Sequence, residues 1–133
     1  MSMNKTLLFT CIVLCTALAA CGPLGSSPKT LTQKDEGSTV HLKVGDILEV
    51  ELEGNPTTGY TWEEAPGGCE QLSQQGQPKF EPSTNALGSG GTMTLRFKAV
   101  QQGTCALKLV YLRTFEPNIA PLSTFEATVV VGQ

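Results

Sequence analysis

The sequence has 133 residues, with nine Lys and Arg against twelve Asp and Glu and a formal net charge of −3. A chain of this length makes one domain with a single small core. Its mild acidity, without any cluster of Lys or Arg, excludes the concentrated basic face that nucleic-acid binding requires. We therefore expect no nucleic-acid partner.

The first twenty residues have the composition of an export signal. A short polar start with Lys5 is followed by an apolar stretch over residues 7–15 and by small residues up to Ala20. The apolar stretch is too short and too weakly apolar to span a bilayer. It predicts a secretory signal peptide over residues 1–20.

Residues 18–21, Leu-Ala-Ala-Cys, resemble the lipobox of bacterial lipoproteins. The resemblance implies cleavage before Cys21, acylation of that cysteine with chains such as palmitate, and a membrane anchor that does not cross the bilayer. Gly22, in place of Asp, implies export to the outer membrane, facing the periplasm or the cell surface. The alternative is plain cleavage after Ala20, which leaves a free thiol.

Removal of the signal leaves eight Lys and Arg against twelve Asp and Glu, a formal net charge of −4, and three cysteines. Residues 21–38 contain few apolar side chains. Such a segment buries too little apolar surface to fold. We expect a lipidated Cys21 and a flexible tether over residues 21–38, followed by the folded domain over residues 39–133.

Apolar and polar residues alternate along most of that domain. The alternation is clear over residues 39–44, 48–53, 93–99, 106–111 and 125–131; another strand starts at residues 60–62, and a weaker stretch covers residues 70–80. A period of two predicts strands with one buried and one exposed face, and it favours antiparallel pairing. About seven short strands in a domain of this size are typical of an all-β, immunoglobulin-like antiparallel β-sandwich.

The order of strands also groups the connections between them. If successive strands run up and down, the chain reverses at one end of the sandwich at residues 54–59, 81–91 and 114–122, and at the other end at residues 45–46, 66–69 and 101–103. The first three connections are rich in Gly, Pro, Asn and Thr. Loops gathered at one end of a rigid sandwich commonly form binding sites.

Two cysteines fall at the end away from those connections. Cys69 closes the strand that begins at Tyr60, and Cys105 opens the strand that ends near Arg113. In an exported, oxidising setting this placement predicts a disulfide between Cys69 and Cys105. The alternative is a pair of separate buried thiols.

The sequence lacks the residue sets that catalysis and metal binding need. His41 is the only histidine and belongs to the exposed face of its strand. Glu49, Glu51 and Glu53 form an acidic stripe that is typical of a solvated strand face. Residues 88–91, Gly-Ser-Gly-Gly, lack the Lys and the helix of a phosphate-binding loop. We therefore expect no enzyme activity, no cofactor and no metal site.

Three motifs in the grouped connections resemble, in order and spacing, those of the chagasin family, proteinaceous inhibitors of papain-like cysteine peptidases with an immunoglobulin-like sandwich. They read Asn-Pro-Thr-Thr-Gly-Tyr with Trp62 beyond, Gly-Ser-Gly-Gly-Thr, and Arg-Thr-Phe. The resemblance implies a peptidase partner and these peptidase-binding residues: Asn55, Pro56, Thr57, Thr58, Gly59, Tyr60, Gly88, Ser89, Gly90, Gly91, Thr92, Arg113, Thr114 and Phe115.

The resemblance also implies a mechanism. Thr57 and Thr58 enter the peptidase cleft over its catalytic Cys and His, residues 88–92 pair by backbone with the substrate-binding rim, and Arg113 and Phe115 lie on the leaving-group side. Thr114 stands where the family has Pro, which leaves that loop less pre-organised. Phe115 stands where it has Trp, which reduces the stacking area. The alternative is a non-inhibitory immunoglobulin-like envelope module that binds another partner. We expect a monomer.

Overall fold

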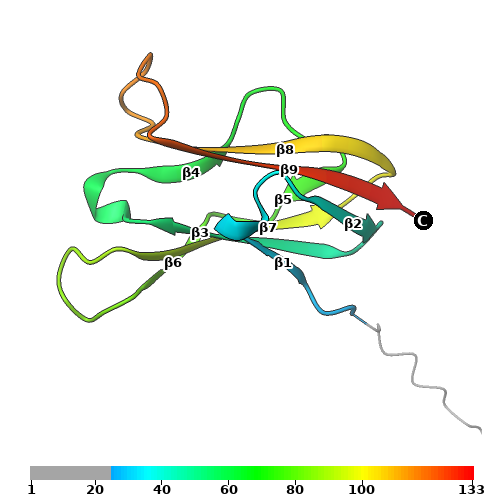
Figure 1. Cartoon of the computed structure of the whole chain (residues 1–133), viewed down its shortest axis with the longest axis horizontal. Coiled ribbons are helices and arrows are strands. Elements are labelled where there is room, and N and C mark those ends of the chain that lie inside the picture. The colour runs from blue at the N-terminus through cyan, green and yellow to red at the C-terminus, as the bar shows by residue number, and fades with distance from the viewer. Residues whose placement is uncertain (1–24) are drawn as a thin grey trace, which may run out of the picture.

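The computed structural model describes residues 25–133, so the predicted signal peptide and Cys21 lie outside the described residues. The chain forms two β-sheets that pack face to face (Figure 1). The elements are β1 (Lys29–Thr32), the 3₁₀ turn η1 (Gln33–Asp35), β2 (Thr39–Lys43), β3 (Ile47–Gly54), the 3₁₀ turn η2 (Pro56–Thr58), β4 (Thr61–Glu64), β5 (Leu72–Gln74), β6 (Lys79–Pro82), β7 (Gly91–Ala99), β8 (Gly103–Leu112) and β9 (Ser123–Gly132). This confirms the predicted β-sandwich; residues 25–133 form nine strands, where about seven were expected.

Two of the strand pairs differ from the expected antiparallel arrangement. The first sheet has the order β1-β3-β7-β5, with β6 also paired to β7, and the second has the order β2-β9-β8-β4. β1 runs parallel to β3, and β2 runs parallel to β9. The expectation is wrong for these pairs because period-two alternation reports burial and not strand direction. The chain leaves the first sheet for β2 and returns beside β1 in the same direction.

The segment expected as a tether is partly folded. Residues 29–32 pair with residues 48–51 of β3, and Leu31 is buried in the core. The Asp35 carboxylate then accepts hydrogen bonds from the backbone amide and the hydroxyl of Thr32, which caps η1. The folded domain thus begins near Lys29 rather than Thr39. Leu31 is the only residue of β1 that is buried, and β1 pairs with β3 even so.

The core lies between the sheets and follows the alternation. Its largest fully buried side chains come from five strands: Leu48, Val50, Leu52, Trp62, Leu95, Phe97, Leu107, Leu109, Phe125 and Val129. The Trp62 indole nitrogen donates to the Glu53 carbonyl oxygen at 2.9 Å, so its polar group is satisfied inside the core. On the outer face His41 is exposed, and Arg96 pairs with Glu49 at 2.9 Å.

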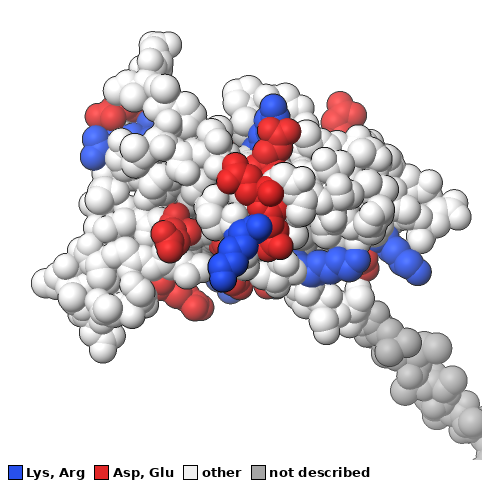
Figure 2. Space-filling view, in the orientation of Figure 1, with Lys and Arg blue, Asp and Glu red and all other residues white. Residues whose placement is uncertain are grey.

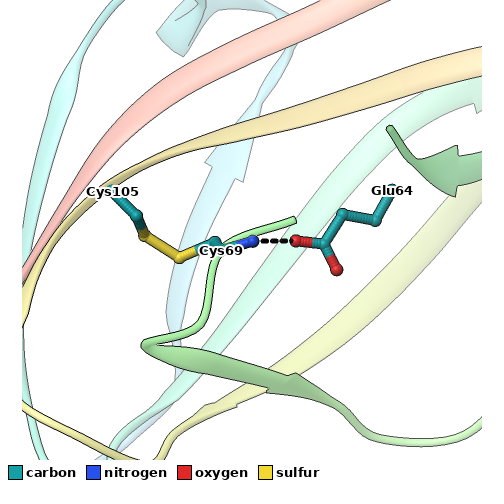
Figure 3. Close-up of a disulfide and its surroundings, with 3 residues drawn as sticks. All are labelled: Glu64, Cys69 and Cys105. Atoms are coloured by element: carbon teal, nitrogen blue, oxygen red, sulfur yellow. Dashed lines mark hydrogen bonds between the residues drawn. A yellow bond between two sulfur atoms is a disulfide. The ribbon is translucent and has the colours of Figure 1, made fainter. Parts of the chain in front are cut away.

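A disulfide closes the end of the sandwich where β8 begins. Cys69 and Cys105 are bonded, with 5.4 Å between their α-carbons (Figure 3). The Cys69 amide donates to a Glu64 carboxylate oxygen at 2.6 Å. Because β8 starts at Gly103 and ends at Leu112, the bond lies at the opposite end of that strand from residues 113–122. Across residues 25–133, neither helical segment is long or apolar enough to cross a membrane.

Candidate functional site

Three loops meet at one end of the sandwich, as the strand order predicts. The first loop (residues 55–60) joins β3 to β4, the second loop (residues 83–90) joins β6 to β7, and the third loop (residues 113–122) joins β8 to β9. They form the left end of the molecule in Figure 1, with the first loop between the other two. The Asn55 side-chain amide donates to the Gly88 carbonyl oxygen at 2.9 Å, and the Arg113 Nε donates to the Thr58 carbonyl oxygen at 3.0 Å.

The first loop is a capped 3₁₀ turn. The Asn55 side-chain oxygen accepts from the Thr57 amide at 3.2 Å and from the Thr57 hydroxyl at 2.5 Å. The Thr58 hydroxyl donates to the Asn55 carbonyl oxygen at 2.6 Å. Gly59 ends the turn with a φ of 83°, the left-handed conformation that favours glycine. Pro56, Thr57 and Thr58 are exposed, so the loop presents a rigid tip of small side chains.

Tyr111 supports this turn from below. Its hydroxyl accepts a hydrogen bond from the Asn55 amide at 2.7 Å, and its ring stacks between Tyr60 and Trp62 at centroid distances of 5.2 and 5.1 Å. Tyr111 is a core residue of β8, paired with Trp62 across the sheet. Sequence reasoning missed this role, although the inward parity of Tyr111 opposite the first loop is a signal for it.

Arg113 turns back onto its own protein. Besides its bond to Thr58, its guanidinium lies 4.6 Å from the centre of the Tyr60 ring and 3.4 Å from a Glu116 carboxylate oxygen. The Arg113 guanidinium thus makes a cation–π contact and an ion pair within the domain. The resemblance implies that Arg113 lies on the leaving-group side of the peptidase, and this stays a prediction. Within the domain, Arg113 supports the first loop.

Phe115 packs against the same loop. A β-carbon at Gly59 would lie 3.0 Å from the Cε1 and Cζ atoms of the Phe115 ring. Gly59 therefore meets two demands, a left-handed backbone and a close aromatic neighbour. Phe115 remains 66% exposed, so part of its side chain lies against the first loop while the rest is open to a partner.

The second-loop motif has two parts: residues 88–90 lie in the loop itself, and Gly91 and Thr92 lie in the following strand. Gly91 and Thr92 already belong to β7, where they pair with Gly54 and Glu53 of β3 on one side and with β6 on the other. A β-carbon at Gly91 would collide with the Glu81 carbonyl oxygen, so this glycine permits the close approach of β6. Within residues 88–90 the carbonyl oxygens of Gly88 and Gly90 accept from Asn55 and Ser83, and the Ser89 amide donates to the Ala86 carbonyl oxygen, so part of this backbone is already bonded inside the domain.

The loop end carries little net charge. Residues 55–60 and 83–92 contain no Asp, Glu, Lys or Arg, and in the third loop Arg113 and Glu116 pair with each other. Figure 2 shows the left end mostly white, apart from a small mixed cluster at the top, while charged side chains gather over the middle and the lower right. Depletion of charge is typical of the centre of a protein–protein interface.

Exposed apolar side chains mark the same end. Leu87 at the tip of the second loop is fully exposed, and Ile119 and Leu122 in the third loop are 61% and 66% exposed. Sequence reasoning missed these three residues, because an isolated apolar residue in a loop belongs to no apolar–polar alternation that would indicate where its side chain lies. The site is therefore a rigid, partly apolar surface with little net charge, made of three loops, which suits protein binding better than catalysis.

Comparisons with known proteins bear on what this surface binds. A sequence profile described as "Chagasin family peptidase inhibitor I42" matches residues 41–129. Amoebiasin-2 of Entamoeba histolytica is 33% identical over 103 residues, which cover 76% of this chain and 83% of the relative. Chagasin of Trypanosoma cruzi is 33% identical over 89 residues, which cover 62% and 79%.

Solved structures agree with these relatives. The crystal structure of the cysteine protease inhibitor EhICP2 from Entamoeba histolytica is similar with a TM-score of 0.66 and 30% identity, over 79% of this chain and 96% of that chain. PbICP-C, solved in complex with falcipain-2, is similar with a TM-score of 0.55 and 26% identity, over 78% and 99%.

Proposed function

Because the chain belongs to the chagasin family of peptidase inhibitors, we propose that it is a reversible, competitive inhibitor of papain-like cysteine peptidases that occludes the active-site cleft with three loops. One observation carries this proposal. The capped turn at residues 55–59 is tied by hydrogen bonds to both flanking loops and to Tyr111. Such a wedge is ordered before it binds, so little conformational entropy is lost on docking.

The first loop fills the cleft over the catalytic Cys and His. Its tip is narrow because Thr57 and Thr58 are small, and their hydroxyls are bonded to Asn55. The tight 3₁₀ turn differs from the extended backbone of a peptide substrate. Access to the nucleophile is therefore blocked without a peptide carbonyl in position for attack.

The flanking loops hold the two walls of the cleft. In the second loop the Gly88 and Gly90 amides and the Ser89 carbonyl oxygen, which make no hydrogen bond within residues 25–133, pair with the rim, since the two glycines permit close approach. In the third loop the exposed face of Phe115 packs on an aromatic side chain of the peptidase. Thr114 lacks the rigidity of proline. Two hydrogen bonds order this loop instead: the Glu116 amide donates to the Arg113 carbonyl oxygen at 3.1 Å, and the Arg113 side chain donates to the Thr58 carbonyl oxygen. A standard interface of about 800 Å² per partner suffices for tight binding.

An inhibition assay tests the proposal. Purified residues 22–133 are mixed with papain or a cathepsin L-like peptidase, and hydrolysis of a fluorogenic peptide is followed. We expect competitive inhibition, lost by orders of magnitude in Thr58→Trp because the indole widens the wedge. Thr104→Trp, on an exposed site near the start of β8, is the matched control and should inhibit like the wild type. Absence of inhibition at micromolar protein would leave the non-inhibitory envelope module as the better account.

We also propose that the protein is exported and anchored to the outer membrane through an acylated Cys21. The Leu-Ala-Ala-Cys motif supports this proposal. So does the path of the chain: β1 runs parallel to β3, which leads into the first loop, so the chain enters the domain at the end away from the loops. An anchor there leaves the loop end free. Cys21→Ser should move the protein from the membrane fraction to the soluble fraction and abolish incorporation of labelled palmitate; retention in the membrane contradicts the proposal.

The inhibitor acts as a monomer in this proposal, because a second copy seated on the loop end would cover the wedge. Light scattering of residues 22–133 should give the mass of a single chain. A stable dimer that separates only when peptidase is added would contradict this.

A further inference from the structure

Exposed large apolar side chains are concentrated in the third loop. Among residues 25–133 there are six: Val44, Leu87, Val100, Phe115, Ile119 and Leu122. Single exposed apolar residues are ordinary, but a group of them on one element marks an interaction surface. Three of the six, Phe115, Ile119 and Leu122, fall within the ten residues of the third loop. We call these three side chains the apolar crest.

The loop that carries the crest is ordered by its own contacts. The Leu122 amide donates to the Tyr111 carbonyl oxygen at 2.8 Å, and the Glu116 amide donates to the Arg113 carbonyl oxygen at 3.1 Å. Pro117 and Pro121 restrict the backbone, and Asn118 holds a left-handed φ of 71°. The loop that exposes the crest to solvent is therefore held in one conformation by its own hydrogen bonds and prolines.

Each crest residue borders the first loop. The Phe115 ring lies against Gly59, and Ile119 lines a small hollow with Tyr60. Leu122 lines a second, separate hollow with Asn55. A partner that receives the first loop must therefore face the crest as well. Beside Phe115 and Ile119 the charges of Arg113 and Glu116 are already paired with each other, while Glu53, which lines the hollow of Leu122, forms no ion pair within residues 25–133. A charged surface opposite Phe115 and Ile119 would find no free counter-charge in Arg113 and Glu116.

We propose that the apolar crest binds an apolar patch on the wall of the peptidase beside its cleft, and that Ile119 and Leu122 thereby select among papain-like peptidases. This inference rests on the proposed function, since it assigns a second contact area to the same complex. Peptidases with an apolar wall on that side are bound tightly, and those with a charged wall are bound weakly because the crest would desolvate that charge without pairing it.

The test compares Ile119→Ser and Leu122→Ser with two matched controls, Val44→Ser and Val100→Ser, whose side chains are 49% and 45% exposed and follow β2 and β7 at the opposite end. Inhibition constants are measured against a panel of papain-like peptidases. We expect each crest variant to raise the inhibition constant about tenfold, through faster dissociation, for at least one peptidase of the panel. The ranking of the panel should change, and thermal unfolding should match that of the controls.

The outcomes separate the two claims. A wild-type chain that inhibits no peptidase overturns the proposed function together with this inference. A wild-type chain that inhibits, with crest variants indistinguishable from the Val44 and Val100 controls on every peptidase, overturns the crest alone. A uniform loss across the whole panel, with an unchanged ranking, overturns the selective role of Ile119 and Leu122.

Discussion

A substitution at Gly59 allows two energetic costs in the first loop to be measured separately: that of a left-handed backbone and that of close packing against Phe115. The φ of Gly59 is 83°, and an added β-carbon would lie 3.0 Å from the Phe115 ring. Gly88 has a similar φ of 75°, but apart from Gly88 itself and its two chain neighbours no described residue has an atom within 4 Å of its β-carbon position. Alanine at Gly88 therefore measures the backbone penalty alone, while alanine at Gly59 adds displacement of the ring.

The expected magnitudes follow from these two geometries. A non-glycine residue in the left-handed region costs roughly 1–2 kcal/mol, so Gly88→Ala should lower the free energy of unfolding by about 1 kcal/mol. Overpacking costs about 1–3 kcal/mol in a closed core. The Phe115 ring is largely exposed and can move, which favours the low end. Gly59→Ala should then cost about 2 kcal/mol and lower Tm by roughly 8 °C.

Urea unfolding of Gly59→Ala, Phe115→Ala and the double variant completes the cycle. With the ring removed, the Gly59 substitution should cost only the backbone penalty, so the two sites couple by about 1 kcal/mol. Inhibition should weaken in Gly59→Ala, because the displaced Phe115 ring belongs to the binding surface; Gly88→Ala is the reference for the free energy of unfolding only, since Gly88 itself faces the peptidase in the proposed complex. The reasoning is refuted if Gly59→Ala costs no more than Gly88→Ala, or costs the same with and without Phe115.

Three further predictions concern the support of the loops and the fold. Tyr111→Phe removes the acceptor of the Asn55 amide and should cost about 1 kcal/mol in urea unfolding and weaken inhibition, whereas equal inhibition would mean that this bond does not order the wedge. Replacing Cys69 and Cys105 by Ala opens a bond across 36 residues and should cost roughly 3–4 kcal/mol on the chain-entropy model, with the inhibition constant of the folded protein unchanged because the bond lies far from the loops. Hydrogen bonds from Thr32 lower the pKa of Asp35, so its contribution is present above the ordinary carboxyl pKa and is lost as the pH falls through the lowered value. Asp35→Asn should thus flatten the acid side of the stability profile, and an unchanged profile counts against the cap.

The fold was largely readable from the sequence because alternation is local information. β2, β3, β7, β8 and β9 follow from their inward apolar residues, and the shared end of the three loops follows from counting reversals. β1 was missed because Leu31 is its only buried apolar residue and its partner, β3, is brought alongside by the tertiary fold. The weak stretch at residues 70–80 proved to be two short strands, β5 and β6, which both pair with β7.

The site was readable in outline and not in detail. Asn-Pro and Thr-Gly predict a rigid turn at residues 55–59, which the structure contains. The direction of the Arg113 side chain could not be predicted, since a guanidinium suits a partner carboxylate and the Thr58 carbonyl equally well. The role of Gly91 depends on the register between β6 and β7, which no local pattern encodes.

The scarcity of net charge at the loop end has a consequence for how complexes form. Long-range attraction needs unpaired charge near the contact, and within the three loops the only charges, on Arg113 and Glu116, cancel; the nearest charges without an ion pair in residues 25–133 are Glu53 and Glu81, on the strands that lead into the first two loops. Encounter is then governed by diffusion and orientation, with a rate constant on the order of 10⁵–10⁶ M⁻¹s⁻¹. Such a protein works almost equally well in dilute and in salty surroundings. For the exported protein proposed above, whose surroundings have no controlled ionic strength, this is a useful property of an inhibitor.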